Sequence, residues 1–215
     1  MTLKPIRTFE STDLEYIAAE LFDPQKPGAI SLPEAIPPNW RVALLQEIRK
    51  APHTPSPGVY DHAREELSHY FPNPLSLFPT AADLAHQHFR FYNCLGNIAS
   101  FDRTPTKPEV CFHYFHQGSI GITPHYDYSR YINMFAVYIL EGQAAFGVCA
   151  DRQKNGAIEL DSRPGSIILL RSPRKPEEKT MRPMHYVGEV HATRRTIVIR
   201  HEALRTRSTD NIPSP

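Results

Sequence analysis

RRTIVIR, at residues 194–200, is the stretch of sequence that says most about the fold. Side chains alternate along a strand, which places on one face Arg194, Thr196, Val198 and Arg200. An arginine that faces the interior of a sheet is costly unless it meets an anion, and a guanidinium group binds a carboxylate through two parallel hydrogen bonds. We therefore expect an organic diacid against this face. The alternative is that Arg200 points into solvent at the end of the strand.

The stretch is the last of eight short runs rich in β-branched and aromatic residues, bounded by Gly, Pro, Asn and Asp. They predict strands at residues 109–116, 119–125, 132–140, 144–150, 156–160, 165–171, 184–190 and 194–202. Eight short strands indicate a double-stranded β-helix, or jelly roll. The two sheets of such a fold leave a mouth in which a ligand or metal can bind.

The first hundred residues have a pattern typical of helices. A capping-box pattern, Thr12-x-x-Glu15, precedes apolar positions at helical spacing and predicts a helix over about 12–22. Further helices are predicted over 40–50, over 60–70 and from Pro79 to about Leu95. The predicted fold class is therefore α+β, with N-terminal helices packed against the jelly roll. We expect a single domain over 1–215, with a mainly helical part at 1–108, a jelly-roll core at 109–204 and a flexible tail at 205–215.

Composition and charge narrow the classes of function. Of the 215 residues, 40% are hydrophobic, and the formal net charge of +1 gives no general attraction to nucleic acids or membranes. The positive charge is local, because residues 171–215 carry 10 Lys+Arg against 5 Asp+Glu. The N-terminus lacks the apolar core of a signal peptide, and no apolar run is long enough to span a bilayer. We expect a soluble, intracellular protein of the cytoplasm.

His125-Tyr126-Asp127 offers a pair of metal ligands. A histidine and a carboxylate at i and i+2 lie on the same face of an extended strand, so both can hold one ion. A third ligand from a distant strand, either His185 or His191, would leave one side of an Fe(II) ion open for a cosubstrate and oxygen. The same ligand types suit zinc, and a jelly-roll metal-binding module without redox chemistry is an alternative from another class.

The order of these residues resembles the signature of the AlkB-like Fe(II)/2-oxoglutarate dioxygenases. That signature is HxD, a distal histidine and RxS/N-x-x-x-R, matched here by His125-x-Asp127, His185 and Arg194-x-Thr196-x-x-x-Arg200. The spacing between the distal histidine and the first arginine is similar to that in one branch of the family, and it favours His185 over His191. The resemblance covers about residues 109 to 202.

The resemblance implies a set of roles for these residues. Iron would be bound by His125, Asp127 and His185. Arg194 and Thr196 would hold the distal carboxylate of 2-oxoglutarate, and Arg200 would lie near its keto-acid end. His113 and Phe115 occupy the region where the family usually carries an Asn and a Tyr that touch this cosubstrate. The implied chemistry uses O2 to convert 2-oxoglutarate to succinate and to hydroxylate a substrate C–H bond.

The substrate is less defined by the sequence than the chemistry. Members that repair nucleic acids often carry another acidic residue soon after HxD, whereas this chain has Tyr128-Ser129-Arg130. With the near-neutral charge, this favours a small-molecule substrate, and Tyr128 and Arg130 are the predicted substrate contacts. The alternative is oxidative demethylation of a nucleic acid, with phosphate contacts from Arg130, Arg171 and Arg174. Hydroxylation of a protein is a third option.

Overall fold

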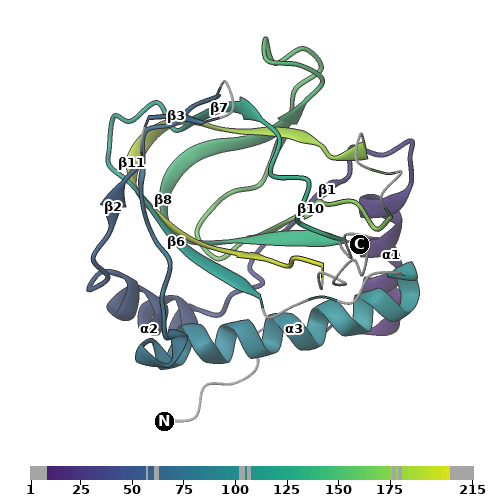
Figure 1. Cartoon of the computed structure of the whole chain (residues 1–215), viewed down its shortest axis with the longest axis horizontal. Helices are drawn as coiled ribbons and strands as arrows, with labels where there is room; N and C mark the ends of the chain where they lie inside the picture. The colour runs from purple at the N-terminus through teal and green to yellow at the C-terminus, as the bar shows by residue number, and fades with distance from the viewer. Residues whose placement is uncertain are drawn as a thin grey trace, which may run out of the picture.

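The computed structural model describes residues 9–56, 58–60, 63–101, 105, 108–175, 178 and 181–203. Its main feature is a sheet of nine hydrogen-bonded strands, and every pairing between the described strands is antiparallel (Figure 1). The strands of this sheet are β1 (Ala29–Leu32), β2 (Thr54–Pro55), β5 (Ser68–Tyr70), β6 (Glu109–Phe115), β7 (Ile122–His125), β8 (Met134–Cys149), β9 (Ile158–Leu160), β10 (Ile167–Arg171) and β11 (Met184–Arg200). A separate hairpin is formed by β3 (Val59–Tyr60) and β4 (Ala63–Arg64).

Two long strands, β8 and β11, connect two layers of the sheet. The first half of β8 pairs with β10 and its second half with β9, while β11 pairs first with β7 and then with β6. The ladder between β8 and β11 shifts register between Val187 and Thr196, where both strands bend. At Gly142 (φ +91°) a Cβ atom would lie 2.3 Å from the carbonyl oxygen of Thr193, so the crossing requires glycine. The arrangement is consistent with the predicted double-stranded β-helix.

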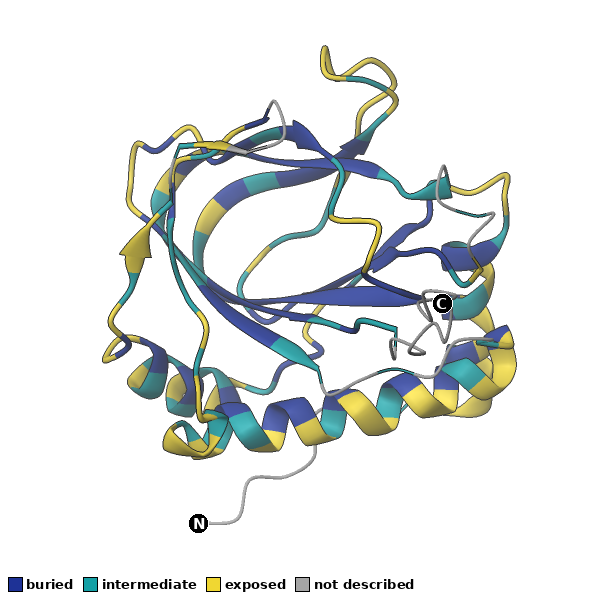
Figure 2. Ribbon diagram, in the orientation of Figure 1, coloured by how far each residue is buried: buried dark blue, intermediate teal, exposed yellow. Residues whose placement is uncertain are grey.

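Helices cover the outer face of the larger layer (Figure 1). They are α1 (Ser11–Phe22), α2 (Pro38–Ile48) and α3 (Pro79–Ala99), with a short 3-10 helix at Leu75–Leu77. Buried and exposed residues alternate along the helices (Figure 2). The buried helix residues belong to one apolar cluster with strand side chains such as Phe112, Tyr138 and Ile197. A second apolar cluster, which includes Phe115 and Val198, fills the space between the layers. The segregated helices and antiparallel strands agree with the predicted α+β class.

None of the helices in the described part of the chain has the length and apolar character needed to cross a membrane.

Three of the four predicted helices are present, and the helix predicted at 60–70 is wrong. This region forms short strands, of which β5 pairs with β6 through Ser68↔Tyr114 and Tyr70↔Phe112. Backbone hydrogen bonds to the sheet therefore override a weak local pattern. The capping box of α1 also differs, because the backbone N–H of Glu10 donates to Asp13, two residues before the predicted Thr12–Glu15 pattern.

The prediction of eight short strands is wrong in their number and length. The runs predicted at 132–140 and 144–150 form the single strand β8, and those at 184–190 and 194–202 form β11 up to Arg200. The polar residues between the runs lie at register shifts, where the chain bends without leaving the ladder. The tail predicted at 205–215 lies outside the described residues.

Candidate metal and cosubstrate site

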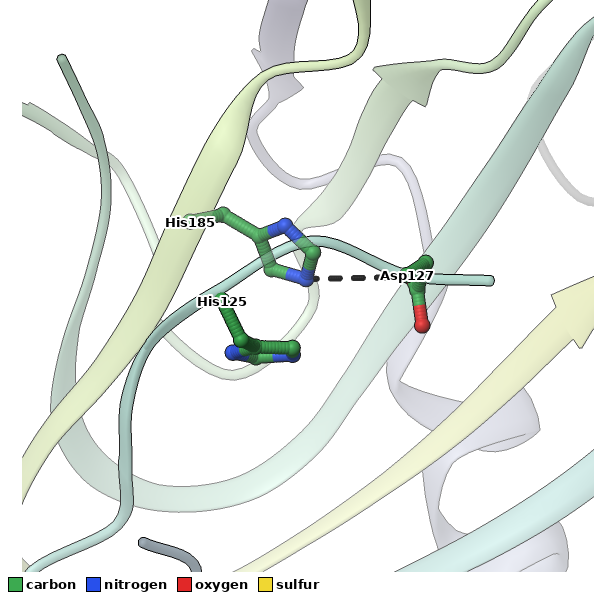
Figure 3. Close-up of side chains that lie close together, drawn as sticks. All are labelled: His125, Asp127 and His185. Carbon is green, nitrogen blue, oxygen red and sulfur yellow. Dashed lines mark ion pairs between the residues drawn. The ribbon is translucent and has the colours of Figure 1, made fainter. Parts of the chain in front are cut away.

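His125, Asp127 and His185 come together at one end of the space between the layers. His125 is the last residue of β7, Asp127 follows it outside any strand, and His185 near the start of β11 is the direct cross-strand partner of His125. One ligand atom from each side chain lies within 4.8 Å of the other two. Figure 3 shows the three side chains facing one another, with the ion pair between His185 and Asp127 drawn as a dashed line.

Both histidine rings are oriented by backbone carbonyls. The Nδ1 atom of His125 is 3.0 Å from the carbonyl oxygen of Thr123, and that of His185 is 3.3 Å from the carbonyl oxygen of Pro183. Each Nδ1–H therefore donates, which leaves the Nε2 lone pair for a metal, as is usual for metal-binding histidines. The His185 ring also stacks on Phe146, with 5.9 Å between the ring centroids.

The carboxylate of Asp127 has one oxygen engaged and one available. Its Oδ1 lies 3.3 Å from Nη2 of Arg200, whereas Oδ2 lies 3.7 Å from Nε2 of His185 and accepts no hydrogen bond from the described residues. Burial opposes the charge of Asp127, but Arg200 and the neighbouring histidines outweigh it and lower the pKa of the carboxyl group. An ionised carboxylate with a free, buried oxygen is a ready monodentate metal ligand.

His185 is also in the protonation state that a metal requires. Burial, reinforced by the nearby His125, lowers its pKa to about 3. A neutral imidazole can coordinate a metal without first losing a proton. The donor set of two neutral nitrogens and one anionic oxygen therefore fits Fe(II), Zn(II) or another divalent transition metal.

A pocket that reaches the two histidines of this triad extends between the two layers. Its lining residues are His113, Phe115, Ile122, His125, Phe135, Val137, Phe146, His185, Val187, Arg194, Thr196, Val198 and Arg200. The structure thus places one face of the RRTIVIR stretch on the pocket. It also brings His113 and Phe115 of β6 to the same space, with His113 directly opposite Thr196 in the ladder. Burial lowers the pKa of His113 to about 3, so its ring is neutral as well.

Arg194 is a buried cation without an anionic partner among the described residues. Arg194 is 1% exposed. Its Nη1 donates to the carbonyl oxygens of Ser162 (3.3 Å) and Ala144 (3.4 Å), whereas Nε and Nη2 have no hydrogen-bond partner among the described residues. Burial lowers its pKa to about 10, which leaves the group charged at neutral pH. A buried guanidinium whose Nε and Nη2 have no partner is suited to binding a ligand carboxylate.

Arg200 faces inward, so the alternative of a solvent-exposed Arg200 is wrong. Its side chain is 13% exposed and contacts Oδ1 of Asp127, with Glu109 3.6 Å away on the other side. Burial lowers its pKa, but Asp127 together with Tyr131, Cys111 and Glu109 outweighs burial, so the net shift is upward. His191, the competing candidate for the third ligand, is exposed, and His185 takes that place in the triad.

The predicted substrate residues lie outside the pocket lining. Tyr128 is 46% exposed, and the guanidinium group of Arg130 stacks on its ring at 4.5 Å. Arg130 also pairs with Glu202, with Nε and Oε1 2.8 Å apart. Both residues follow directly after the metal-binding segment, so they form part of the rim beside it.

The arginines that were predicted as phosphate contacts have partners within the protein. Arg171 is 7% exposed and donates through Nε to the carbonyl oxygen of Met181 at 2.7 Å. Arg174 pairs with Glu178 (2.8 Å) and donates to the carbonyl oxygen of Ala99. These guanidinium groups connect segments of the chain, which argues against their predicted role in binding phosphate.

Sequence reasoning missed other residues of the site. Phe135 and Phe146 line the pocket and contact the ring of His185, but in the sequence they are ordinary apolar residues of strands. Arg182, which donates to the backbone of Asp127, lies in a charged segment with no periodic pattern. Only the three-dimensional arrangement identifies these three residues.

Comparisons with known proteins relate the fold to one class of enzymes. No family model matches the chain, and no curated protein matches it. Among solved structures, a prolyl-4-hydroxylase of Pseudomonas putida has a TM-score of 0.68 at 13% identity, covering 87% of this chain and 99% of its own. A prolyl hydroxylase of Trichoplax adhaerens, in complex with a peptide fragment of hypoxia inducible factor, has a TM-score of 0.68 at 11% identity, with 91% and 94% covered.

A third similar structure contains a divalent metal together with 2-oxoglutarate, the cosubstrate that the sequence predicts for this site. HygX from Streptomyces hygroscopicus, with nickel and 2-oxoglutarate bound, has a TM-score of 0.61 at 12% identity, covering 92% of this chain and 89% of its own. An oxidoreductase of the 2-oxoglutarate/Fe(II) oxygenase family from Burkholderia pseudomallei has a TM-score of 0.61 at 15% identity, with 94% of this chain and 95% of its own covered. The chain therefore has the fold of 2-oxoglutarate- and iron(II)-dependent oxygenases. The narrower resemblance to the AlkB-like branch stays a prediction.

Proposed function

We propose that the protein is an Fe(II)- and 2-oxoglutarate-dependent dioxygenase that hydroxylates a C–H bond of a small molecule. The observation that carries the proposal is one pocket with two complementary features. At one end, His125, Asp127 and His185 present converging ligand atoms, and the pocket also contains the buried, partly unpaired guanidinium of Arg194. A metal would meet the converging ligand atoms, and a dicarboxylate that chelates the metal would meet the guanidinium group of Arg194.

The ligand set suits Fe(II) through Nε2 of both histidines and Oδ2 of Asp127. When bound, the iron supplies the redox chemistry that activates O2 for C–H hydroxylation while 2-oxoglutarate is converted to succinate. Arg200 contacts Oδ1 of Asp127, so Oδ2 would be the oxygen available to the metal. Three protein ligands in this arrangement leave coordination positions free for the cosubstrate and oxygen.

The remaining pocket residues would bind the cosubstrate. Arg194 and Thr196 are proposed to hold the distal carboxylate of 2-oxoglutarate, and Arg200 to lie near the keto-acid end. His113 and Phe115 would flank the carbon chain from β6. Apolar neighbours such as Phe146 exclude water, which strengthens the interaction between the carboxylate and the guanidinium.

A small-molecule substrate is favoured by the charges around the site. Nucleic-acid binding depends on cations that are free to contact phosphates. Of the three arginines considered for that task, Arg171 is buried, and Arg130 and Arg174 are paired with carboxylates. Tyr128, beside Asp127 and partly exposed, is the proposed contact for the substrate.

Succinate formation from 2-oxoglutarate, measured with Fe(II) and a panel of substrates, tests this proposal. Small metabolites, short peptides and methylated oligonucleotides should be compared, each with a matched Asp127→Asn enzyme. We expect a small molecule to stimulate turnover and the variant to lose turnover while remaining folded. Stimulation by oligonucleotides, with binding that weakens steeply as salt rises, would instead support the demethylase alternative.

Metal content distinguishes redox from non-redox roles. Protein purified without oxygen and supplied with Fe(II) should show 2-oxoglutarate turnover that Zn(II) abolishes, because zinc has no redox chemistry. Tight zinc binding, together with no turnover in the iron-loaded protein for any substrate, would favour a zinc protein or a non-redox metal-binding module.

A further inference from the structure

Asp127 is the ligand whose position the sheet does not determine. β7 ends at His125, and residues 126–128 belong to no strand or helix. His125 and His185, in contrast, are cross-strand partners whose backbones are fixed by the β7–β11 ladder. A metal site needs its ligands held to within about 0.5 Å, so the Asp127 segment requires support from side chains.

Arg182 contacts this segment at two points. Its Nη1 donates a hydrogen bond to the carbonyl oxygen of Asp127. Its guanidinium group also lies over the ring of Tyr126, with 5.3 Å between Cζ and the ring centroid. Arg182 is three residues before His185 in the chain. One side chain therefore connects the segment that carries Asp127 to the strand that carries the third ligand.

We propose that Arg182 is a positioning residue that sets the geometry of the metal site through the backbone of Asp127. This inference rests on the proposed function for the identity of the metal. Arg182 would act without touching the metal, the cosubstrate or the substrate. The hydrogen bond fixes the peptide group of Asp127. The contact with Tyr126 fixes the residue that lies between the ligands His125 and Asp127.

A substitution that removes the charge of Arg182 separates this role from a purely electrostatic one, because the two roles change metal affinity in opposite directions. A guanidinium group next to a metal ligand repels a divalent cation, so removal of its charge alone would strengthen metal binding. Loss of the positioning contacts would instead weaken metal binding, because removal of a residue that supports a metal ligand typically lowers metal affinity by about 10- to 100-fold. The two accounts of Arg182→Met therefore predict changes of opposite direction.

Arg152 provides a matched control on the neighbouring strand β7. Its Nη1 donates to the carbonyl oxygen of Pro124 at 3.2 Å, so it also holds the backbone near the ligands through one hydrogen bond. Pro124 lies within β7, where the ladder already supports the chain. Removal of Arg152 should therefore affect the metal site much less than removal of Arg182.

The experiment measures Co(II) affinity and the visible spectrum of the Co(II)-loaded protein for wild type, Arg182→Met, Arg182→Lys and Arg152→Met. We expect Arg182→Met to bind Co(II) about 10- to 100-fold more weakly with an altered spectrum, in line with the usual size of such contributions. Arg182→Lys, which keeps the charge and a donor, should recover part of the affinity, and Arg152→Met should stay near wild type.

Amide hydrogen exchange of residues 122–128 in the metal-free proteins gives a readout independent of metal. Faster exchange confined to residues 126–128 in Arg182→Met supports the proposal. Co(II) affinity of Arg182→Met equal to or above that of wild type would overturn it, as would an equal loss in Arg152→Met. If wild type binds no divalent metal, the proposed function fails, and unchanged exchange at residues 126–128 would then separately overturn the role of Arg182.

Discussion

Arg194→Met should weaken 2-oxoglutarate binding strongly while the protein stays folded. The guanidinium is buried, and its Nε and Nη2 have no partner among the described residues, so a ligand carboxylate would meet two free donors. Truncation of one partner of such a buried charged pair typically costs about 2–5 kcal/mol. At about 1.4 kcal/mol for each factor of ten, the dissociation constant should rise between roughly 30-fold and 3000-fold.

The same substitution should have a small effect on the stability of the ligand-free protein. Burial lowers the Arg194 pKa from 12.5 to about 10, so the charged form carries a cost of roughly 3 kcal/mol that methionine would remove. Loss of the donor to the carbonyl oxygen of Ser162 acts in the opposite direction, at about 1–3 kcal/mol for a buried acceptor left unpaired. The carbonyl oxygen of Ala144 keeps the hydroxyl group of Ser162 as a donor. The free energy of unfolding should therefore change by no more than about 2 kcal/mol.

Titration calorimetry without oxygen, with Mn(II) in place of iron, measures the binding. A second ligand, 2-oxopentanoate, keeps the keto-acid end and lacks the distal carboxylate, so wild type should prefer 2-oxoglutarate and Arg194→Met should lose that preference. Arg195→Met is the matched control, because Arg195 points to the opposite face and pairs with Glu141. A folded Arg194→Met protein that retains wild-type affinity and preference would refute the assignment of Arg194.

Buried side chains away from the pocket also make testable contributions to stability. Burial, reinforced by His201, holds the pKa of His88 well below its ordinary value of 6.5. The contribution of the neutral His88 ring to the free energy of unfolding is therefore fully present above about pH 6.5 and is lost below it, by up to about 1.4 kcal/mol per pH unit. His88→Gln should reduce this dependence of stability on pH, measured by urea denaturation between about pH 7.5 and about pH 5. Phe112→Ala, at a fully buried position between the sheet and the helices, should lower the free energy of unfolding by about 3–5 kcal/mol. The exposed Phe71→Ala should change it by less than about 0.5 kcal/mol, and equal effects of the two would contradict the assigned core.

Alternation along RRTIVIR was sufficient to place its residues correctly. Arg194, Thr196 and Arg200 line the pocket, while Ile197 and Ile199 pack toward the helices, because a strand of a layered sheet must sort its side chains between two faces. Strong amphipathic spacing likewise located the helices at 11–22, 38–48 and 79–99 to within a few residues.

Features that depend on contacts between distant segments could not be predicted. The region 60–70 has too weak a pattern to decide between helix and strand, and its pairing with β6 decides it. The strand predicted at 119–125 does end at His125, so strand alternation could not place Asp127, and side chains from elsewhere hold it. Nothing local in the sequence around Arg182 distinguishes it from the other charged residues of its segment.

Anaerobic titration of the purified protein with Fe(II) and then 2-oxoglutarate tests the central claim most directly. Chelation of iron by the cosubstrate produces a weak visible charge-transfer band. We predict that this band appears with one equivalent of each ligand, that it is absent in His185→Ala, and that admission of O2 yields succinate. A folded protein that binds no iron, or that binds iron but gives neither the band nor succinate, would contradict the claim that this pocket is a 2-oxoglutarate-dependent iron site.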